Sequence, residues 1–176
     1  MTKILIREVE LDEVPFLQQF ASKLFKETYI PFSAEADIDT YITDNYTEQK
    51  LKQGISNPES SFYFIEVDET IAGFCKLDIG DLQTDHRFEN ALEVEKLYID
   101  QRFKGQGLGR KLIYFAEEHA LELNKSLVWL GVWEGNKDAA GFYEHLGFEP
   151  QGTHEFQLGS ELQTDFLLAK RIKAKR

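Results

Sequence analysis

The segment Lys104–Lys111, which reads KGQGLGRK, is the feature that most constrains the fold. It lies between a predicted strand, Ala91–Ile99, and a predicted helix, Leu108–Leu123. Glycines let the main chain approach a ligand closely, and the first N–H groups of a helix have no partner within that helix. Such a turn suits a diphosphate. A tight turn with a purely structural role is the alternative interpretation.

The position of this turn argues against two common nucleotide-binding folds. A P-loop needs a glycine, four further residues and then Gly-Lys-Ser/Thr, a pattern that the segment does not contain. A dinucleotide-binding fold places its glycine-rich turn after the first strand of the unit. Here the turn follows the fourth predicted strand.

Alternation of apolar residues, helical periodicity and turn residues predict the other elements. A helix beginning at an Asp12 cap is expected to run toward Thr28, and Gly147 is expected to close the last helix. The expected strands are Ile4–Glu10, Phe62–Val67, Ile71–Asp78, Ala91–Ile99, Ser126–Val132, Thr153–Leu158 and Gln163–Lys170, and the further expected helices are Ala34 to about Gly54, Leu108–Leu123 and Lys137–Leu146. The second and third strands, and the last two, are expected to form hairpins.

The charge of the chain is uneven. The whole chain of 176 residues has a net charge of -11, but residues 170–176 carry five of its 20 basic residues and no acid. Residues 1–169 therefore hold 15 bases against 31 acids. This balance disfavours nucleic acids and anionic membranes as partners. Residues 102–111 form a local exception, with four basic residues and no acid.

Other residue types point to a cytoplasmic protein without a metal. Cys75 is the only cysteine, so an intramolecular disulfide is excluded, and we interpret it as a small buried apolar residue rather than a nucleophile. The chain starts without a secretory signal pattern and contains no apolar run long enough to span a bilayer. His86, His119, His145 and His154 show no metal-ligand spacing.

With these residues in view, the chain resembles the GCN5-related N-acetyltransferases (GNAT). Their acyl-CoA motif, Gln/Arg-x-x-Gly-x-Gly/Ala, matches Lys104–Gly109 with Lys104 in the first position. The order of predicted elements is also that of the family. The segments LEVEKLYID, NKSLVWLGVWEGNKDAAGFYEHLGF and ELQTDFLLAK look like those of the PaiA-type bacterial spermidine/spermine acetyltransferases.

The resemblance implies an α+β fold (α/β three-layer). This fold is a central mixed, mostly antiparallel twisted sheet of about seven strands with helices on both faces. It also implies one N-acetyltransferase domain over residues 1–176, with a basic tail at 170–176, and acetyl-CoA as the cosubstrate.

The resemblance also assigns residues to acetyl-CoA. The main chain of Leu97, Tyr98 and Ile99 would pair with the pantetheine arm. The turn would hold the diphosphate through main-chain amides and three basic side chains, and its residues are Lys104, Gly105, Gln106, Gly107, Leu108, Gly109, Arg110 and Lys111. Asn136 would bond the pantetheine, and Tyr143 would direct its hydroxyl at the CoA sulfur as an acid. The alternatives are solvated helix residues for Arg110 and Lys111, a helix cap for Asn136 and a core aromatic for Tyr143.

The reaction implied is attack of a primary amine on a thioester, and the amine must lose a proton because an alkyl ammonium has a pKa near 10.4. Glu93 is the first candidate for the base, directly or through water, and Glu95 is the reserve. Without a bulge, both carboxylates would share a strand face with Leu97 and Ile99. A bulge in this strand would decide which of the two faces the cleft.

We expect the acceptor to be a primary amine of a small molecule and, more specifically, a polycationic one such as a polyamine. Candidate lining residues are Glu27, Thr28, Tyr29, Trp133 and His154–Phe156. Two alternatives stay open, a protein or peptide N-acetyltransferase with an open groove and a non-catalytic acyl-CoA-binding regulator. The terminal hairpin decides between small and large acceptors. The chain could be a monomer or a homodimer.

Overall fold

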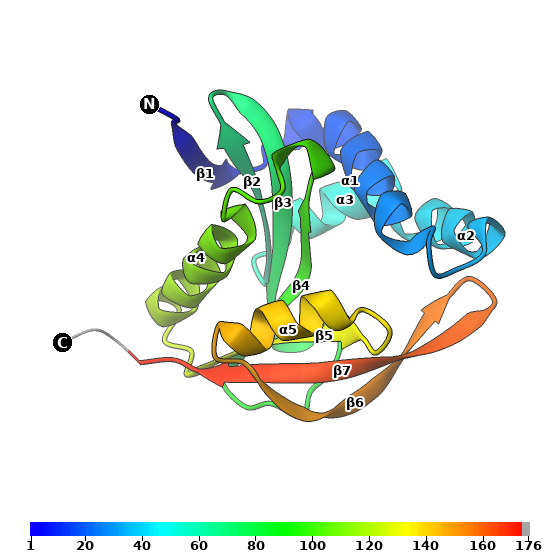
Figure 1. Cartoon of the computed structure of the whole chain (residues 1–176). Helices are drawn as coiled ribbons and strands as arrows, with labels where there is room; N and C mark the ends of the chain where they lie inside the picture. Colours follow the sequence, from blue (N-terminus) through cyan, green and yellow to red (C-terminus); the bar gives the residue numbers. More distant parts are fainter. Residues whose placement is uncertain (174–176) are drawn as a thin grey trace.

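The structure is a computed structural model and describes residues 1–173. Its strands and helices follow one another around a single seven-stranded sheet (Figure 1). In chain order they are β1 (Ile4–Glu8), α1 (Val14–Tyr29), α2 (Glu35–Asn45), α3 (Glu48–Ser56), β2 (Ser60–Val67), β3 (Thr70–Ile79), β4 (Ala91–Ile99), α4 (Leu108–Glu122), β5 (Leu127–Trp133), α5 (Lys137–His145), β6 (Glu149–Leu158) and β7 (Glu161–Arg171).

The strand order is β1-β2-β3-β4-β5-β7-β6, and only β4 and β5 are parallel neighbours. The predicted mixed, mostly antiparallel sheet is therefore confirmed. The first predicted hairpin is also confirmed, because β2 and β3 pair across a two-residue turn at Asp68 and Glu69 with φ of 47° and 69°. Positive φ at both central residues gives the turn a twist that matches the strands.

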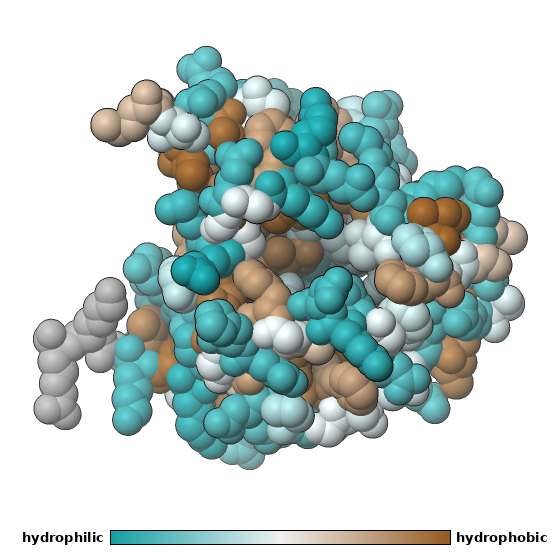
Figure 2. All heavy atoms as spheres, in the orientation of Figure 1, coloured by the Kyte–Doolittle hydropathy of each residue, from teal (hydrophilic) through white to brown (hydrophobic). Residues whose placement is uncertain are grey.

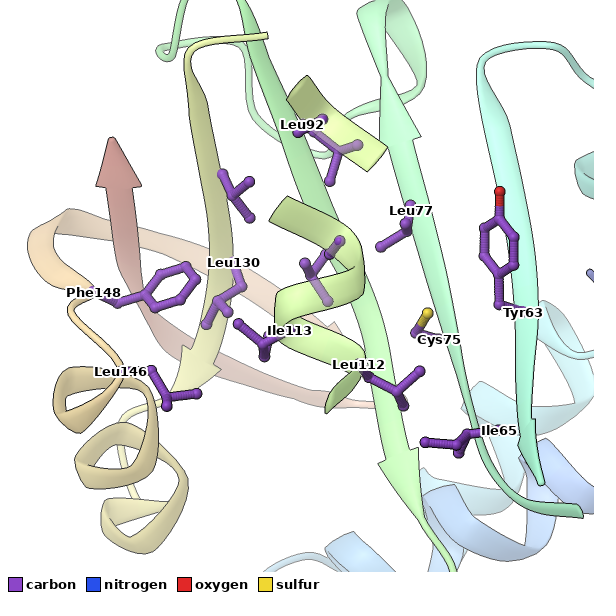
Figure 3. Packing of buried hydrophobic residues seen from close by; sticks show 14 of the residues in the cluster. Tyr63, Ile65, Cys75, Leu77, Leu92, Leu112, Ile113, Leu130, Leu146 and Phe148 are labelled. Atoms are coloured by element: carbon purple, nitrogen blue, oxygen red, sulfur yellow. The ribbon is translucent and has the colours of Figure 1, made fainter. Parts of the chain in front are cut away.

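Helices cover both faces of the sheet, as expected. One core lies between α4 and the sheet, where Leu112 and Ile113 pack on Cys75 and Leu77 of β3 and on Leu130 of β5 (Figure 3). The second core lies on the opposite face and is built from α1, α2 and α3, with Phe25, Phe64 and Phe74 among its fully buried side chains. Burial of these apolar side chains is the main source of stability.

Two predicted helix boundaries are wrong. The stretch predicted as one helix to Gly54 is two helices, because Thr47 caps α3 by accepting a hydrogen bond from the Lys50 amide at 3.1 Å. Asp12 does not cap α1 either. It lies in the short 3-10 turn Leu11–Glu13, where Glu10 and Glu13 form the capping box instead.

The C-terminal elements extend beyond their predicted bounds. Strand β6 begins at Glu149 and passes a bulge at Pro150–Thr153. The basic tail begins inside β7, where Lys170 Nζ lies 2.9 Å from Glu117 Oε1 of α4. Residues 174–176 of that tail lie outside the described residues.

Strand β4 contains a bulge at Glu95. Lys96 pairs with Lys76 of β3, and Val94 pairs with the next residue, Leu77, so Glu95 is left over between them. As a result Val94 and Leu97 both pack in the core under α4. Glu93, Glu95, Leu97 and Ile99 therefore do not share one face, the arrangement expected without a bulge, because the extra residue reverses the alternation.

The bulge leaves Glu93 on the sheet face away from α4, where its side chain is buried. Glu93 is 3% exposed, and its two carboxylate oxygens accept hydrogen bonds from the Thr84 amide at 2.7 Å and the Thr84 hydroxyl at 2.6 Å. Burial raises the pKa of Glu93 to about 7, although the two bonds from Thr84 favour the ionised form.

Glu93 should make the protein less stable as the pH rises. The unfolded chain releases this proton near pH 4.3 and the folded chain near 7, so the stability that it contributes below pH 4.3 is lost between these values. In urea unfolding followed by circular dichroism, the free energy of unfolding of Glu93→Gln relative to the wild type should rise by on the order of 1–3 kcal/mol from pH 5 to pH 8. The exposed Glu149→Gln is the control, and a pH-independent difference for Glu93→Gln would contradict the raised pKa.

Candidate active site

Strands β4 and β5 part soon after they meet. Their parallel pairing covers three residue pairs, from Ala91 with Leu127 to Glu93 with Trp129, and no later pair joins the two strands in the described part of the chain. Beyond that point β5 is paired with β7 alone and β4 with β3 alone. The facing edges of β4 and β5 therefore offer free main-chain groups, which a bound chain of similar hydrogen-bonding capacity can satisfy.

A cavity of about 640 Å³ opens at this parting. Its walls come from α1 and the turn after it, β4, the glycine-rich turn, β5 and α5. Figure 2 shows the recess near the middle of the molecule, with apolar residues at its floor and hydrophilic residues around it. The predicted site residues that line it are Leu97, Tyr98, Ile99, Lys104, Gly105, Gly107, Leu108, Gly109, Arg110, Asn136 and Tyr143. Gln106, Lys111 and Glu93 are outside the lining.

The glycine-rich turn has the geometry of an anion-binding helix start. Gly105 and Gly107 have φ of 82° and 75°, and Gly107 is the N-cap of α4 without any side-chain cap. A Cβ at either glycine would meet nothing within 4 Å, so the glycines are needed for the left-handed backbone rather than for space. The first amides of α4 are thus left open to a ligand.

The basic residues of the turn differ in whether they form ion pairs with the protein. Arg102 is bound to Asp100, with Nη2 3.0 Å from Oδ2. Lys104, Arg110 and Lys111 make no ion pair with a described residue. Three cations therefore remain available beside the helix start.

Helix α5 brings two further predicted residues to the cavity. Asn136 is the N-cap of α5, and its side-chain oxygen accepts a hydrogen bond from the Ala139 amide at 3.2 Å. Its role as a helix cap is therefore real, and its side chain also borders the cavity. Tyr143 packs edge-on against Phe148, and burial raises the pKa of its hydroxyl. That hydroxyl makes no hydrogen bond to a described residue.

Glu95, rather than Glu93, lines the cavity. Its Oε2 lies 3.4 Å from Lys96 Nζ and 3.8 Å from Lys76 Nζ and has no hydrogen-bond partner among the described residues. Burial works to raise the pKa of Glu95, but the two lysines, Lys96 above all, bring it below its ordinary value. Glu95 is therefore an ionised carboxylate at neutral pH that is paired with two lysines.

The cavity continues toward α1. Glu27, Thr28, Tyr29 and Trp133 line it as expected, whereas His154–Phe156 do not. Phe32, which sequence reasoning missed, also lines it, and its ring lies 4.9 Å from that of Trp133. A single aromatic in a turn follows no period, so the sequence carries no signal for it.

The terminal hairpin is bound to residues next to this end of the cavity, although no residue of β6 or β7 is part of the lining. The amide and hydroxyl of Ser160, at the tip between β6 and β7, both donate to Asp37 Oδ1 of α2 at 2.8 Å and 2.7 Å. Gln163 Nε2 of β7 donates to the hydroxyl of Ser33 at 3.0 Å. These contacts bridge the hairpin to α2 and to the turn before it.

Among residues 1–173, no three His, Cys, Asp or Glu side chains are grouped so that they could hold a metal ion. Within the same residues, none of the helices has the length and apolarity needed to cross a membrane.

Comparisons with known proteins agree with this geometry. The model of the Acetyltransferase (GNAT) family matches residues 19–148. The chain is 38% identical to an uncharacterized N-acetyltransferase of Lactobacillus delbrueckii over 98% of this chain and 99% of that one. It is 33% identical to the spermine/spermidine N(1)-acetyltransferase of Bacillus subtilis over 69% of this chain and 84% of that one.

Among solved structures, the PaiA N-acetyltransferase of Thermoplasma acidophilum in complex with coenzyme A superposes with a TM-score of 0.80, at 26% identity and with 96% and 99% of the two chains covered. The chain therefore belongs to the GNAT family of acetyltransferases and is an N-acetyltransferase that uses acetyl-CoA.

Proposed function

We propose that the protein transfers an acetyl group from acetyl-CoA to a primary amine of a small polycationic molecule, a polyamine such as spermidine or spermine. The observation that carries this proposal is the carboxylate of Glu95 on the cavity wall, which is ionised at neutral pH and favours a cationic amine over a neutral acceptor. Ser160 and Gln163 bind the terminal hairpin to Asp37 and Ser33, and a hairpin held in this way favours a small acceptor.

Charge and relatives support a cationic acceptor. The acidic residues outside the tail steer cations toward the protein, and the side chains of Glu27 and Glu95 lie on the cavity wall. A relative 33% identical to this chain carries the name spermine/spermidine N(1)-acetyltransferase.

We assign the cofactor contacts as the sequence suggested. The main chain of Leu97, Tyr98 and Ile99 would pair with the pantetheine arm along the free edge of β4, and the Asn136 amide would bond it from α5. The amides of residues 105–110, including Gln106, would hold the diphosphate. Lys104, Arg110 and Lys111 would add charge, Lys111 from outside the cavity wall.

Glu95 is the better candidate for the base. Glu95 lines the cavity, whereas Glu93 is bound by Thr84 and lies outside the lining. A carboxylate with a lowered pKa is a weak base, so we assign Glu95 two roles. It attracts the acceptor ammonium, and it takes the proton, directly or through water, when the amine attacks.

Tyr143 is the candidate acid. Bound acetyl-CoA supplies the thioester, and a thiol pKa near 8.5 makes the thiolate a tolerable leaving group. The buried Tyr143 hydroxyl keeps its proton at neutral pH and can donate a hydrogen bond to the sulfur as charge develops there. This help is useful but not essential.

The pH dependence of kcat/KM distinguishes the two carboxylates. If Glu95 is the base, it is ionised at every pH from about 6 to 9, and kcat/KM should follow the acceptor ammonium without an inflection near 7. Glu95→Gln should lower kcat/KM by roughly 10- to 100-fold. Glu93→Gln is the matched control and should leave the shape of the profile unchanged. An inflection near pH 7 that disappears in Glu93→Gln would move the base to Glu93.

Replacement of Tyr143 by Phe should lower kcat by roughly 5- to 50-fold and leave the Kd for CoA within about twofold, because only the hydroxyl near the sulfur is lost. Steady-state kinetics and calorimetric titration with CoA measure the two effects. Tyr114→Phe, which alters an exposed tyrosine on α4, is the control. An unchanged kcat in Tyr143→Phe would rule out the acid role.

Thiol release from acetyl-CoA across spermidine, spermine, diamines, amino acids and peptides tests the acceptor class. We expect kcat/KM to be highest for the polyamines and diamines. Turnover with peptides alone would overturn the polyamine assignment, and CoA binding without turnover of any amine would favour the regulator.

A further inference from the structure

Gly131, on the cavity wall, lies next to a carboxylate that the proposed chemistry does not use. Gly131 of β5 lines the cavity and is exposed. A Cβ at this position would lie 3.3 Å from Asp165 Oδ2 and 3.5 Å from His154 Nε2. The missing side chain therefore leaves these two groups of the terminal hairpin facing the space beside β5.

Asp165 belongs to the same face as the acceptor end of the cavity. It pairs with Trp133 across β5 and β7, and directly opposed residues share a sheet face. Tyr29 on the opposite wall is affected by it, since burial raises the pKa of Tyr29 and the charge of Asp165 raises it further. Two cavity-lining residues, Tyr29 and Trp133, thus flank this carboxylate.

Asp165 has one ion-pair partner among the described residues. Its side chain is 13% exposed, and His154 Nε2 lies 3.5 Å from its Oδ2, a distance longer than a good hydrogen bond. The neighbouring carboxylate, Asp85, is differently placed. Arg87 donates to both of its oxygens at 2.9 Å, and His154 Nδ1 lies 3.4 Å from it. Arg87, which stays charged at all working pH values, is therefore paired with Asp85.

We propose that Asp165 is a specificity residue that binds the second ammonium group of a diamine or polyamine while the reacting amine lies near Glu95. This inference rests on the proposed function and names the residue by which the protein would distinguish diamines from monoamines. A half-buried carboxylate accepts strong, charge-assisted hydrogen bonds from an alkyl ammonium. Phe32 and Trp133, whose rings are tilted by 53° to one another on the cavity wall, suit the methylene chain between the two nitrogens.

His154 positions Asp165. It lies between Asp165 and Asp85, and the Trp129 ring packs edge-on against it. The charged groups that face it are these two carboxylates and, through Asp85, Arg87. The hydrogen bond to Asp165 above all raises the pKa of His154. A protonated His154 offsets the charge of Asp165, and an ammonium group of the acceptor would offset the same charge.

The test compares n-butylamine with 1,4-diaminobutane, which has the same carbon chain and one more ammonium group. In Asp165→Asn the KM for the diamine should rise roughly 10- to 50-fold, while the KM for the monoamine and both kcat values stay within about twofold. Unchanged monoamine kinetics also show that the variant is folded. Glu155→Gln removes the same charge from an exposed position on the same hairpin and should leave both KM values unchanged.

An equal loss for the two amines in Asp165→Asn would make its role structural, and unchanged kinetics for both would remove it from the site. Either outcome overturns this inference and leaves the proposed function standing. A wild-type protein that acetylates neither amine, nor any polyamine, overturns the proposed function itself.

Discussion

Strands β4 and β5 are parallel, and they remain hydrogen-bonded for three residue pairs before they separate. A parallel neighbour requires a crossover, which here is α4, so the start of α4 must lie at the end of the strand where the two edges part. The open edges are polar and cannot stay unsatisfied in a buried seam. Every part of the site follows from this geometry, because the glycine-rich turn, β4, β5 and α5 all border the same opening.

The charged groups of the cavity are divided between its parts. At the glycine-rich turn, open helix amides and Lys104 and Arg110 favour an anion. Elsewhere on the wall, the carboxylate of Glu95 lies beside Lys96, and that of Asp165 lies next to Gly131. The net charge of the chain hides this division, since a basic turn and a basic tail are averaged with an acidic body. The turn suits the anionic donor, and the two carboxylates support the cationic acceptor that we propose.

Local features of the sequence predicted several parts of the fold. The glycine-rich turn, the Asp68-Glu69 hairpin and the Gly147 helix end depend on a few adjacent residues, and all three were predicted. The position of the bulge at Glu95 could not be predicted, because the register of the strand depends on how β4 pairs with β3. That one residue moves Glu93 away from the cavity. Asp165 was missed for a similar reason, since its access depends on a glycine of another strand.

The central claim is that the free edge of β4 receives the acyl-CoA arm. Hydrogen–deuterium exchange of the peptide covering residues 94–99, with and without CoA, tests it most directly. We predict that CoA slows exchange of the amides in this segment that face β5 and also slows exchange at the start of α4. Binding of CoA that protects the α4 amides but leaves residues 94–99 exchanging as in the free protein would contradict the account.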